Sequence, residues 1–206
     1  MIKLTEKQKG YACGLCTGRG FIDLLNPTPE QINIDDMITC LDRTYRWLGT
    51  IPFTVNQHQA LVFVLVKRWG GNFATQLEAL IHDGHEYVTG DLASPFKDRL
   101  WMEGPDGDYL CVADVQEKVQ KAIRAKLRFT LEQVAAVDFE LVGKADLFAR
   151  EMEWEHWQDE DTANRAGNAD YDPLDVEIAH ETIGNLAGYD TEGYEYDLAN
   201  LRAHLK

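Results

Sequence analysis

The feature that most constrains the fold is a continuous apolar run at residues 60–66, AlaLeuValPheValLeuVal. The run is far shorter than the ~20 apolar residues that span a bilayer, so it has to be buried within the protein. An apolar run of this kind can be a buried strand, but the length of the surrounding segment favours a helix. Thr54 is a suitable N-cap, and Gly70-Gly71 can end a helix after Trp69. The sequence therefore predicts a core helix from about Thr54 to Trp69.

Apolar residues at helical spacing recur on both sides of this core helix. Residues 34–48 carry the pattern, with acidic residues in the first turn and Gly49 as a stop, and are predicted to form a helix. Asn72 can cap another helix that carries His82 and Asp83 on its last turns. Further helices are predicted at 108–129, at 130–137 (where Thr130 and Gln133 match a capping box), at 138–157 and, more weakly, near 174–187 and 195–205.

Strand signals are nearly absent, so the predicted fold class is all-α. The non-helical segments are a Gly- and Pro-rich loop region at 1–31 with a short strand at 20–25, a loop at 88–108 and a flexible connection at 161–173.

Length and composition are typical of one soluble globular domain: 206 residues, of which 45% are hydrophobic and 27% charged. We expect a single domain over 1–206, with a helical-bundle core at about 32–160 and a C-terminal helical extension at 161–206. The net charge of −15 disfavours a nucleic-acid polymer or an anionic membrane as partner. A small anionic substrate stays compatible, because a metal ion and a few basic side chains can make one pocket locally positive.

Cysteine usage and the first residues bear on the compartment. Four cysteines at irregular spacing are too few for a disulfide framework, and the start shows no secretory signal, so a cytoplasmic location is expected. Cys13 and Cys16 match the Cys-x-x-Cys repeat of cysteine-rich zinc domains. One pair supplies half of a tetrahedral zinc site, which makes a zinc-binding interaction module the minor alternative.

The residues with the clearest chemical potential lie in IleHisAspGlyHisGlu at 81–86. His82 and Asp83 offer an imidazole and a carboxylate ~100° apart around a helix, so both can reach one ion. Glu86 follows one turn later and can hold a water beside that ion. His58 from the core helix and Asp146 from a late helix complete a mixed nitrogen and oxygen set suited to a divalent ion with open positions. Taken singly, a histidine in an apolar helix is more often a core residue and an aspartate a surface one.

The same segments resemble the HD-domain phosphohydrolases, in the phage and bacterial branch of 5'-deoxynucleotidases and DatZ-type dATP triphosphohydrolases. PheThrValAsnGlnHisGln at 53–59 resembles the branch's Tyr-Ser-Val-Ala-Gln-His-Ser signature, and 82–97 resembles its His-Asp-Ala-x-Glu…Gly-Asp…Pro-x-Lys block. Shorter matches lie at 17–21, 34–37 and 46–49. Gly84 departs from the usual alanine, which leaves room for a ligand or a neighbouring helix, and Asn56 departs from the usual Ala or Ser.

The resemblance implies an HD-domain helical bundle and a role for each matching residue. It implies that the metal ligands are His58, His82, Asp83 and Asp146, with Asp138 as a fallback for Asp146. It implies that Glu86 and Asp91 handle water and proton transfer, and that the substrate is bound by Arg46, Trp47, Lys97 and Arg19. Arginine suits phosphate because its planar guanidinium makes two-point contacts with phosphate oxygens.

The implied function is a phosphohydrolase with one divalent metal ion (zinc, cobalt, manganese or magnesium) and a deoxynucleotide substrate. The first expectation is a dATP triphosphohydrolase that releases deoxyadenosine and triphosphate. A 5'-deoxynucleotidase acting on dNMPs is the alternative, and a non-catalytic nucleotide-binding HD protein is the second one. The resemblance also implies a homo-oligomer, either a dimer or a hexamer.

Overall fold

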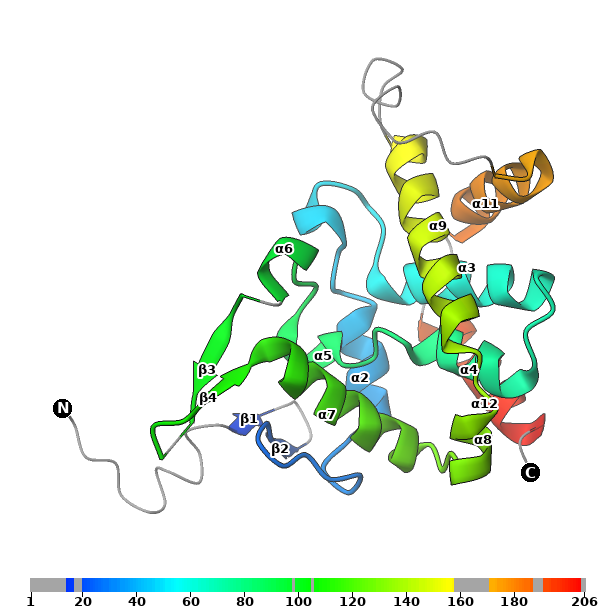
Figure 1. Cartoon of the computed structure of the whole chain (residues 1–206). Coiled ribbons are helices and arrows are strands. Elements are labelled where there is room, and N and C mark those ends of the chain that lie inside the picture. The colour runs from blue at the N-terminus through cyan, green and yellow to red at the C-terminus, as the bar shows by residue number, and fades with distance from the viewer. Residues whose placement is uncertain are drawn as a thin grey trace.

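A computed structural model describes residues 14–16, 20–97, 99–104, 106–157, 171–186 and 191–204. The fold is all-α, as predicted (Figure 1). The helices are α2 (Ile34–Leu41), α3 (Val55–Arg68), α4 (Phe73–Ile81), α5 (Glu86–Thr89), α6 (Ser94–Lys97), α7 (Val112–Lys126), α8 (Leu131–Ala135), α9 (Phe139–Trp157), α11 (Pro173–Asn185) and α12 (Thr191–His204). The strands pair as two antiparallel hairpins, β1 (Gly14–Cys16) with β2 (Phe21–Asp23) and β3 (Trp101–Glu103) with β4 (Tyr109–Cys111).

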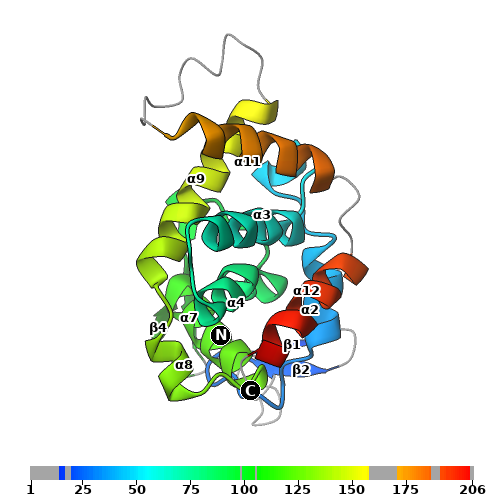
Figure 2. The same cartoon turned by 90° about the vertical axis from the view of Figure 1, so that its right-hand side faces the viewer.

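The apolar run forms the predicted central helix, α3. Thr54 and Gln57 make a capping box at its start, because each side chain accepts a hydrogen bond from the other residue's backbone N–H. Figure 2 shows α3 and α4 in the middle of the molecule, with α9 on one side, α2 and α12 on the other and α11 across one end. The helix that contains the continuous apolar run is thus enclosed by the others.

Helix α4 begins after Asn72, whose side chain accepts a hydrogen bond from the backbone N–H of Thr75, as its sequence predicts. The helix ends at Ile81, however, and His82 is its C-cap. His82 and Asp83 therefore lie in a turn over 82–85, just beyond the last helical turn on which we predicted them. This turn packs closely against another element. A Cβ added at Gly84 would lie 3.2 Å from Cδ1 of Ile123 on α7, so the glycine makes room for a neighbouring helix.

The helix predicted at 34–48 is wrong beyond residue 41. After α2 the chain turns back: the backbone N–H of Arg46 donates to the carbonyl of Phe53, and Tyr45 bridges to Thr54. Trp47 and Leu48 then adopt left-handed φ values of 55° and 57° in a short 3₁₀ turn, η1 (Trp47–Gly49). Leu48, which continued the apolar spacing, is 83% exposed. The helix does not continue because of contacts made elsewhere in the fold: the turn carries the Arg46 side chain into the protein.

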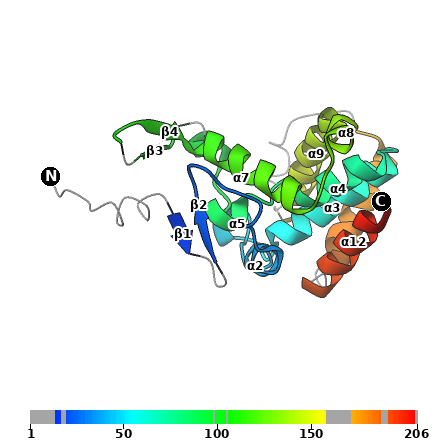
Figure 3. The same cartoon turned by 90° about the horizontal axis from the view of Figure 1, so that it is seen from below.

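The two hairpins refine the predicted non-helical segments. The strand expected at 20–25 is confirmed as β2. The segment predicted as a loop at 88–108 contains α6 and β3, and the helix predicted from residue 108 begins only at Val112. Residues 109–111 instead pair with β3. Figure 3 shows both hairpins at the same end of the molecule, away from α8, α9 and α12.

Two apolar clusters form the core. Members of the first include Met37, Leu80, Ile123 and Tyr194, from α2, α4, α7 and α12. Members of the second include Leu61, Phe148 and Ile183, from α3, α9 and α11. Burying each such side chain contributes roughly 1.5–3 kcal/mol. The C-terminal helices α11 and α12 thus take part in the core. Among the described residues, no helix is both long and apolar enough to cross a membrane.

Candidate metal centre

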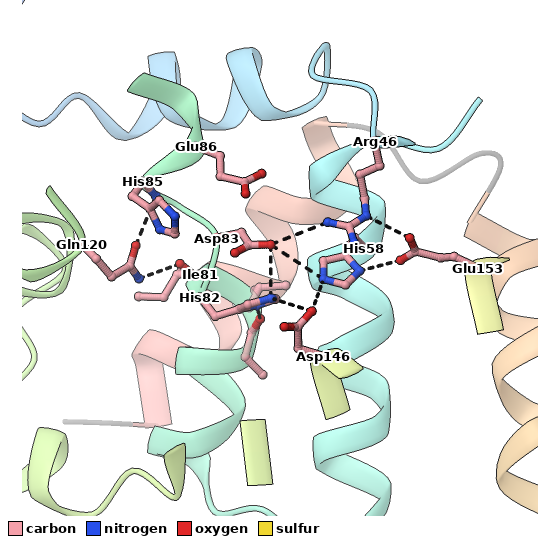
Figure 4. Close-up of polar contacts among 12 residues, drawn as sticks. Arg46, His58, Ile81, His82, Asp83, His85, Glu86, Gln120, Asp146 and Glu153 are labelled. Carbon is pink, nitrogen blue, oxygen red and sulfur yellow. Dashed lines mark hydrogen bonds and ion pairs between the residues drawn. The ribbon is translucent and has the colours of Figure 1, made fainter. Parts of the chain in front are cut away.

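His58 projects from α3 into the space between α4 and α9 and is fully buried. Its Nδ1 lies 2.5 Å from Oε1 of Glu153, and its Nε2 lies 3.0 Å from Oδ1 of Asp146 and 3.7 Å from Oδ2 of Asp83 (Figure 4). The Glu153 carboxylate accepts the hydrogen bond, so the Nδ1 of His58 is the donor. The Nε2 of His58 is then the nitrogen that faces the two aspartates.

His82 has the same orientation. Its Nδ1 donates to the backbone carbonyl of Ala79 at 2.7 Å, since a carbonyl can only accept. Its Nε2 lies 3.4 Å from Oδ2 of Asp83 and 3.9 Å from Oδ1 of Asp146, and it is buried without a hydrogen-bond partner. The ring centroids of His58 and His82 are 5.2 Å apart.

These contacts define a donor set that fits a divalent ion. Ligand atoms of His58, His82 and Asp83 lie within 4.8 Å of one another, and Asp146 contacts both imidazoles. In metal sites, a ligating histidine typically donates its other ring N–H to a carboxylate or a carbonyl, and both histidines do so here. All four predicted ligands are therefore brought together. The fallback is not needed, because the Asp138 carboxylate accepts from the Leu141 backbone N–H at the start of α9.

Glu153 organises the centre and was not predicted from the sequence. Its Oε2 accepts from Nε of Arg46 at 2.9 Å and from Nε1 of Trp47 at 3.0 Å, while its Oε1 bonds His58. Glu153 is fully buried on α9, seven residues after Asp146. Two helical turns separate the two acids, so they face the same side. That spacing of two acids on one helix face is the signal by which the sequence could have indicated Glu153.

Burial and charge set the protonation of the centre. Burial and Arg46 oppose protonation of His58, but Glu153 and Asp146 outweigh them and raise its pKa to about 9. Burial opposes ionisation of Asp83, but His82 and His58 outweigh it and lower its pKa to about 2. The pKa of Asp146 is likewise lowered: burial opposes ionisation, and the hydrogen bond from His58 dominates. The carboxylates are thus ionised at neutral pH, and a bound cation would replace the proton on Nε2 of His58.

A cavity of about 470 Å³ opens above the ligands, within the size range of small-molecule sites. It is lined by the predicted residues Arg46, Trp47, Asp83, Glu86, Asp91, Lys97 and Asp146. Arg150 and Trp154 of α9 also line it and were not predicted. The Trp47 and Trp154 rings are 5.0 Å apart between centroids and tilted by 45°.

On the wall of the cavity, Lys97 and Glu86 form an ion pair, with Nζ 3.0 Å from Oε1. Burial, followed by the charge of Asp83, raises the pKa of Glu86 to about 8 despite this lysine.

Three residues singled out in the sequence have no described side chain: Arg19 and Cys13 lie outside the described residues, and only the backbone of Cys16 falls within them. Their roles stay predictions.

Comparison with known proteins adds little to this site. No protein-family model matches the sequence. An uncharacterized protein of Rhodobacter capsulatus is 38% identical over 82 residues, which is 37% of this chain and 42% of that protein. The chain therefore spans less than half the length of this relative.

Proposed function

We propose that this chain is a metal-dependent phosphohydrolase of the HD type that acts on deoxynucleotides, with dATP as the first substrate to test. One observation carries the proposal. Two histidines from different segments, each held through Nδ1, direct their Nε2 atoms toward two ionised aspartates at the base of a cavity. That arrangement suits a cation far better than it suits a packed core, because it leaves the Nε2 atom of His82 without a partner.

The ion would be held by His58, His82, Asp83 and Asp146. A divalent ion bound there would polarise a phosphoryl group and make a nearby water more acidic.

Basic groups on the cavity wall support a phosphorylated substrate. Arg46 binds Glu153 through Nε and approaches Asp83 with Nη1 at 3.7 Å, which fixes its plane and leaves Nη2 for a phosphate oxygen. Lys97 and Arg150 line the same cavity. Arginine is the stronger phosphate ligand because it contacts two oxygens at once. Together these groups counter the negative charge of the substrate in a chain of net charge −15.

Aromatic and acidic groups support the remaining roles. The neighbouring rings of Trp47 and Trp154, tilted by 45° to each other, offer an apolar wall for a nucleoside. Glu86 and Asp91 line the cavity beside Asp83, where they can orient a water and transfer its proton. The reaction adds water to the phosphorus next to the sugar, and the bond from that phosphorus to the 5' oxygen breaks. The proton from water reaches the 5' oxygen, so a deoxynucleoside leaves.

Both expected reactions, on dATP and on a dNMP, break this same bond. They differ only in whether the cavity accepts the two further phosphates. The test is to incubate the protein with each dNTP and dNMP in Mn²⁺, Co²⁺, Zn²⁺ or Mg²⁺ and to resolve deoxynucleoside, phosphate and triphosphate by chromatography. Asp83→Ala is the inactive variant, and Glu140→Ala, an exposed acid on α9, is its matched control.

Deoxyadenosine and triphosphate from dATP, lost only in Asp83→Ala, would support the triphosphohydrolase. Phosphate from monophosphates alone would change the assignment to a 5'-deoxynucleotidase. Nucleotide binding without any product, for every substrate and metal, would overturn the proposal and favour a binding protein.

A further inference from the structure

Asp83 stands between two groups of potential ligands. On one side are His58 and His82, described above. On the other side are His85 and Glu86, and ligand atoms of Asp83, His85 and Glu86 lie within 4.8 Å of one another. Figure 4 shows the His85 ring and the Glu86 carboxylate across Asp83 from His58 and Arg46. The Asp83 carboxylate has two oxygens, so it can serve both groups.

This second group has buried polar atoms without partners. Nδ1 of His85 and Oε2 of Glu86 have no hydrogen-bond partner among the described residues, and Glu86 is only 1% exposed. Each buried polar atom left unsatisfied destabilises a fold, because it has lost its hydrogen bonds to water. Two such atoms beside an ionised aspartate are the arrangement that a bound cation would satisfy.

The chain holds His85 in this position through a specific contact. Gln120 of α7 is buried, and its Oε1 accepts from the backbone N–H of His85 while its Nε2 donates to the carbonyl of Ile81. Gln120 thereby ties the turn at 82–85 to α7 on both sides. The close approach at Gly84 permits this packing. The backbone of the turn, which Gln120 fixes against α7, therefore determines where His85 lies.

Lys97 should lower the affinity of this group of ligands for a cation. Its Nζ lies 3.0 Å from Oε1 of Glu86, which leaves Oε2 free. The lysine charge also repels a cation bound at Oε2. A cation here should thus bind more weakly than one held by His58, His82, Asp83 and Asp146.

We propose that Asp83, His85 and Glu86 form a second divalent-cation site that shares Asp83 with the first. Two carboxylate oxygens with one imidazole nitrogen suit a divalent ion that favours oxygen ligands, such as Mn²⁺. The inference deepens the proposed function and rests on it for the substrate. Two cations joined by one carboxylate can hold a phosphoryl group from two sides, as in two-metal hydrolases. Glu86 would then act as a ligand through Oε2, and of the two acids assigned above to water and proton transfer, Asp91 would keep that role.

The experiment measures Mn²⁺ stoichiometry, without substrate, by equilibrium dialysis and by electron paramagnetic resonance, which detects magnetic coupling between neighbouring Mn²⁺ ions. We expect two Mn²⁺ per wild-type chain, with coupling. His85→Gln should bind one ion, lose the coupling and weaken the second site by about tenfold or more. His156→Gln, a histidine change outside the site, should keep both ions.

Lys97→Met is the complementary variant, and it should tighten the second site several-fold because a neighbouring positive charge is removed. One Mn²⁺ per wild-type chain at saturation, or two coupled ions in His85→Gln, would overturn the inference. The Mn²⁺ stoichiometry of the wild-type chain tests the inference by itself, even where a variant folds poorly. One ion with hydrolysis would reject this inference alone, whereas two coupled ions without hydrolysis of any deoxynucleotide would reject the proposed function alone.

Discussion

Among the described residues, two pairs of histidine rings lie close together, and they differ in the contacts of their ring nitrogens. His58 and His82 have centroids 5.2 Å apart, and each donates its Nδ1 proton to a separate acceptor. His156 of α9 and His180 of α11 are stacked with centroids 5.6 Å apart, but their Nδ1 atoms face each other at 3.3 Å.

The difference shows that proximity of histidines does not make a metal site. In the first pair the outer contacts leave both Nε2 atoms directed at Asp83 and Asp146, inside the protein. In the second pair the Nδ1 atoms contact each other near the surface, with one carboxylate, Glu155, 3.9 Å from Nε2 of His180. The first pair belongs to a group of residues that could hold a cation, and the second joins α11 to α9. The following predictions test this contrast.

The largest effect is expected for His82→Ala. Removing Nε2 of His82 takes away one ligand of the first site, so the affinity for the first Mn²⁺ should fall by more than about 100-fold, beyond the loss typical of outer contacts. Hydrolysis should be lost with it. Equilibrium dialysis measures the affinity, and His180→Ala is the matched control. An unchanged first-site affinity in His82→Ala would contradict the assignment of the pair.

A smaller effect is expected for Glu153→Gln, which keeps the shape of the side chain but removes its charge. His58 loses its carboxylate partner, and Arg46 loses an ion-pair partner, so the affinity for the first ion should fall by about 10–100-fold. Dialysis against Mn²⁺ measures the change, and Glu140→Gln on the same helix is the control. If both variants bound the ion equally, Glu153 would have no part in orienting His58.

A change of stability, without a change in metal binding, is expected for Asp175→Asn. The Asp175 carboxylate accepts from Arg68 and from Trp69 and holds α11 against α3. Its loss should lower the free energy of unfolding by about 1 kcal/mol. Burial opposes ionisation of Asp175, but the Arg68 and Trp69 hydrogen bonds lower its pKa, so this stabilisation is fully present above pH ~4 and is lost as the pH falls through the lower folded-state pKa. Urea unfolding should show a smaller difference between variant and wild type at pH 3.5 than at pH 7.

The smallest effect is expected for His156→Ala, which should change the free energy of unfolding by no more than about 0.5 kcal/mol at pH 7.5. Burial and the neighbouring His180 lower the pKa of His156. The unfolded chain therefore binds this proton more readily, and wild-type stability should decrease as the pH falls through ~6.5. The variant should lose less stability over that range in thermal unfolding. An equal loss in both would show that the pKa of His156 is the same in the folded and the unfolded protein.

Local signals made much of the fold predictable. The capping box at Thr54 and the Asn72 cap depend on residues three positions apart, so the sequence alone reveals α3 and α4. The predicted ligand His58 lies near the start of α3, and the predicted ligands His82 and Asp83 directly follow the end of α4.

The misses have long-range causes. The helix predicted at 34–48 ends at Leu41 because Arg46 pairs with Glu153, a residue 107 positions away. The strand at Tyr109–Cys111 depends on pairing with β3, which helical spacing cannot reveal. Arg150, Glu153 and Trp154 lie beyond the segment that resembles HD phosphohydrolases, where only the periodicity of α9 was available to place them.

Glu153 also makes the metal centre and the cavity wall thermodynamically dependent on each other. One carboxylate accepts from His58, a predicted ligand, and from Arg46 and Trp47, which line the cavity. A cation on Nε2 of His58 would polarise its Nδ1 proton toward Glu153, while a phosphate on Arg46 would draw that guanidinium away from it. Occupancy of either place would therefore change the free energy of binding at the other. Because coupling free energies are reciprocal, the factor by which the ion changes nucleotide affinity must equal the factor by which the nucleotide changes ion affinity.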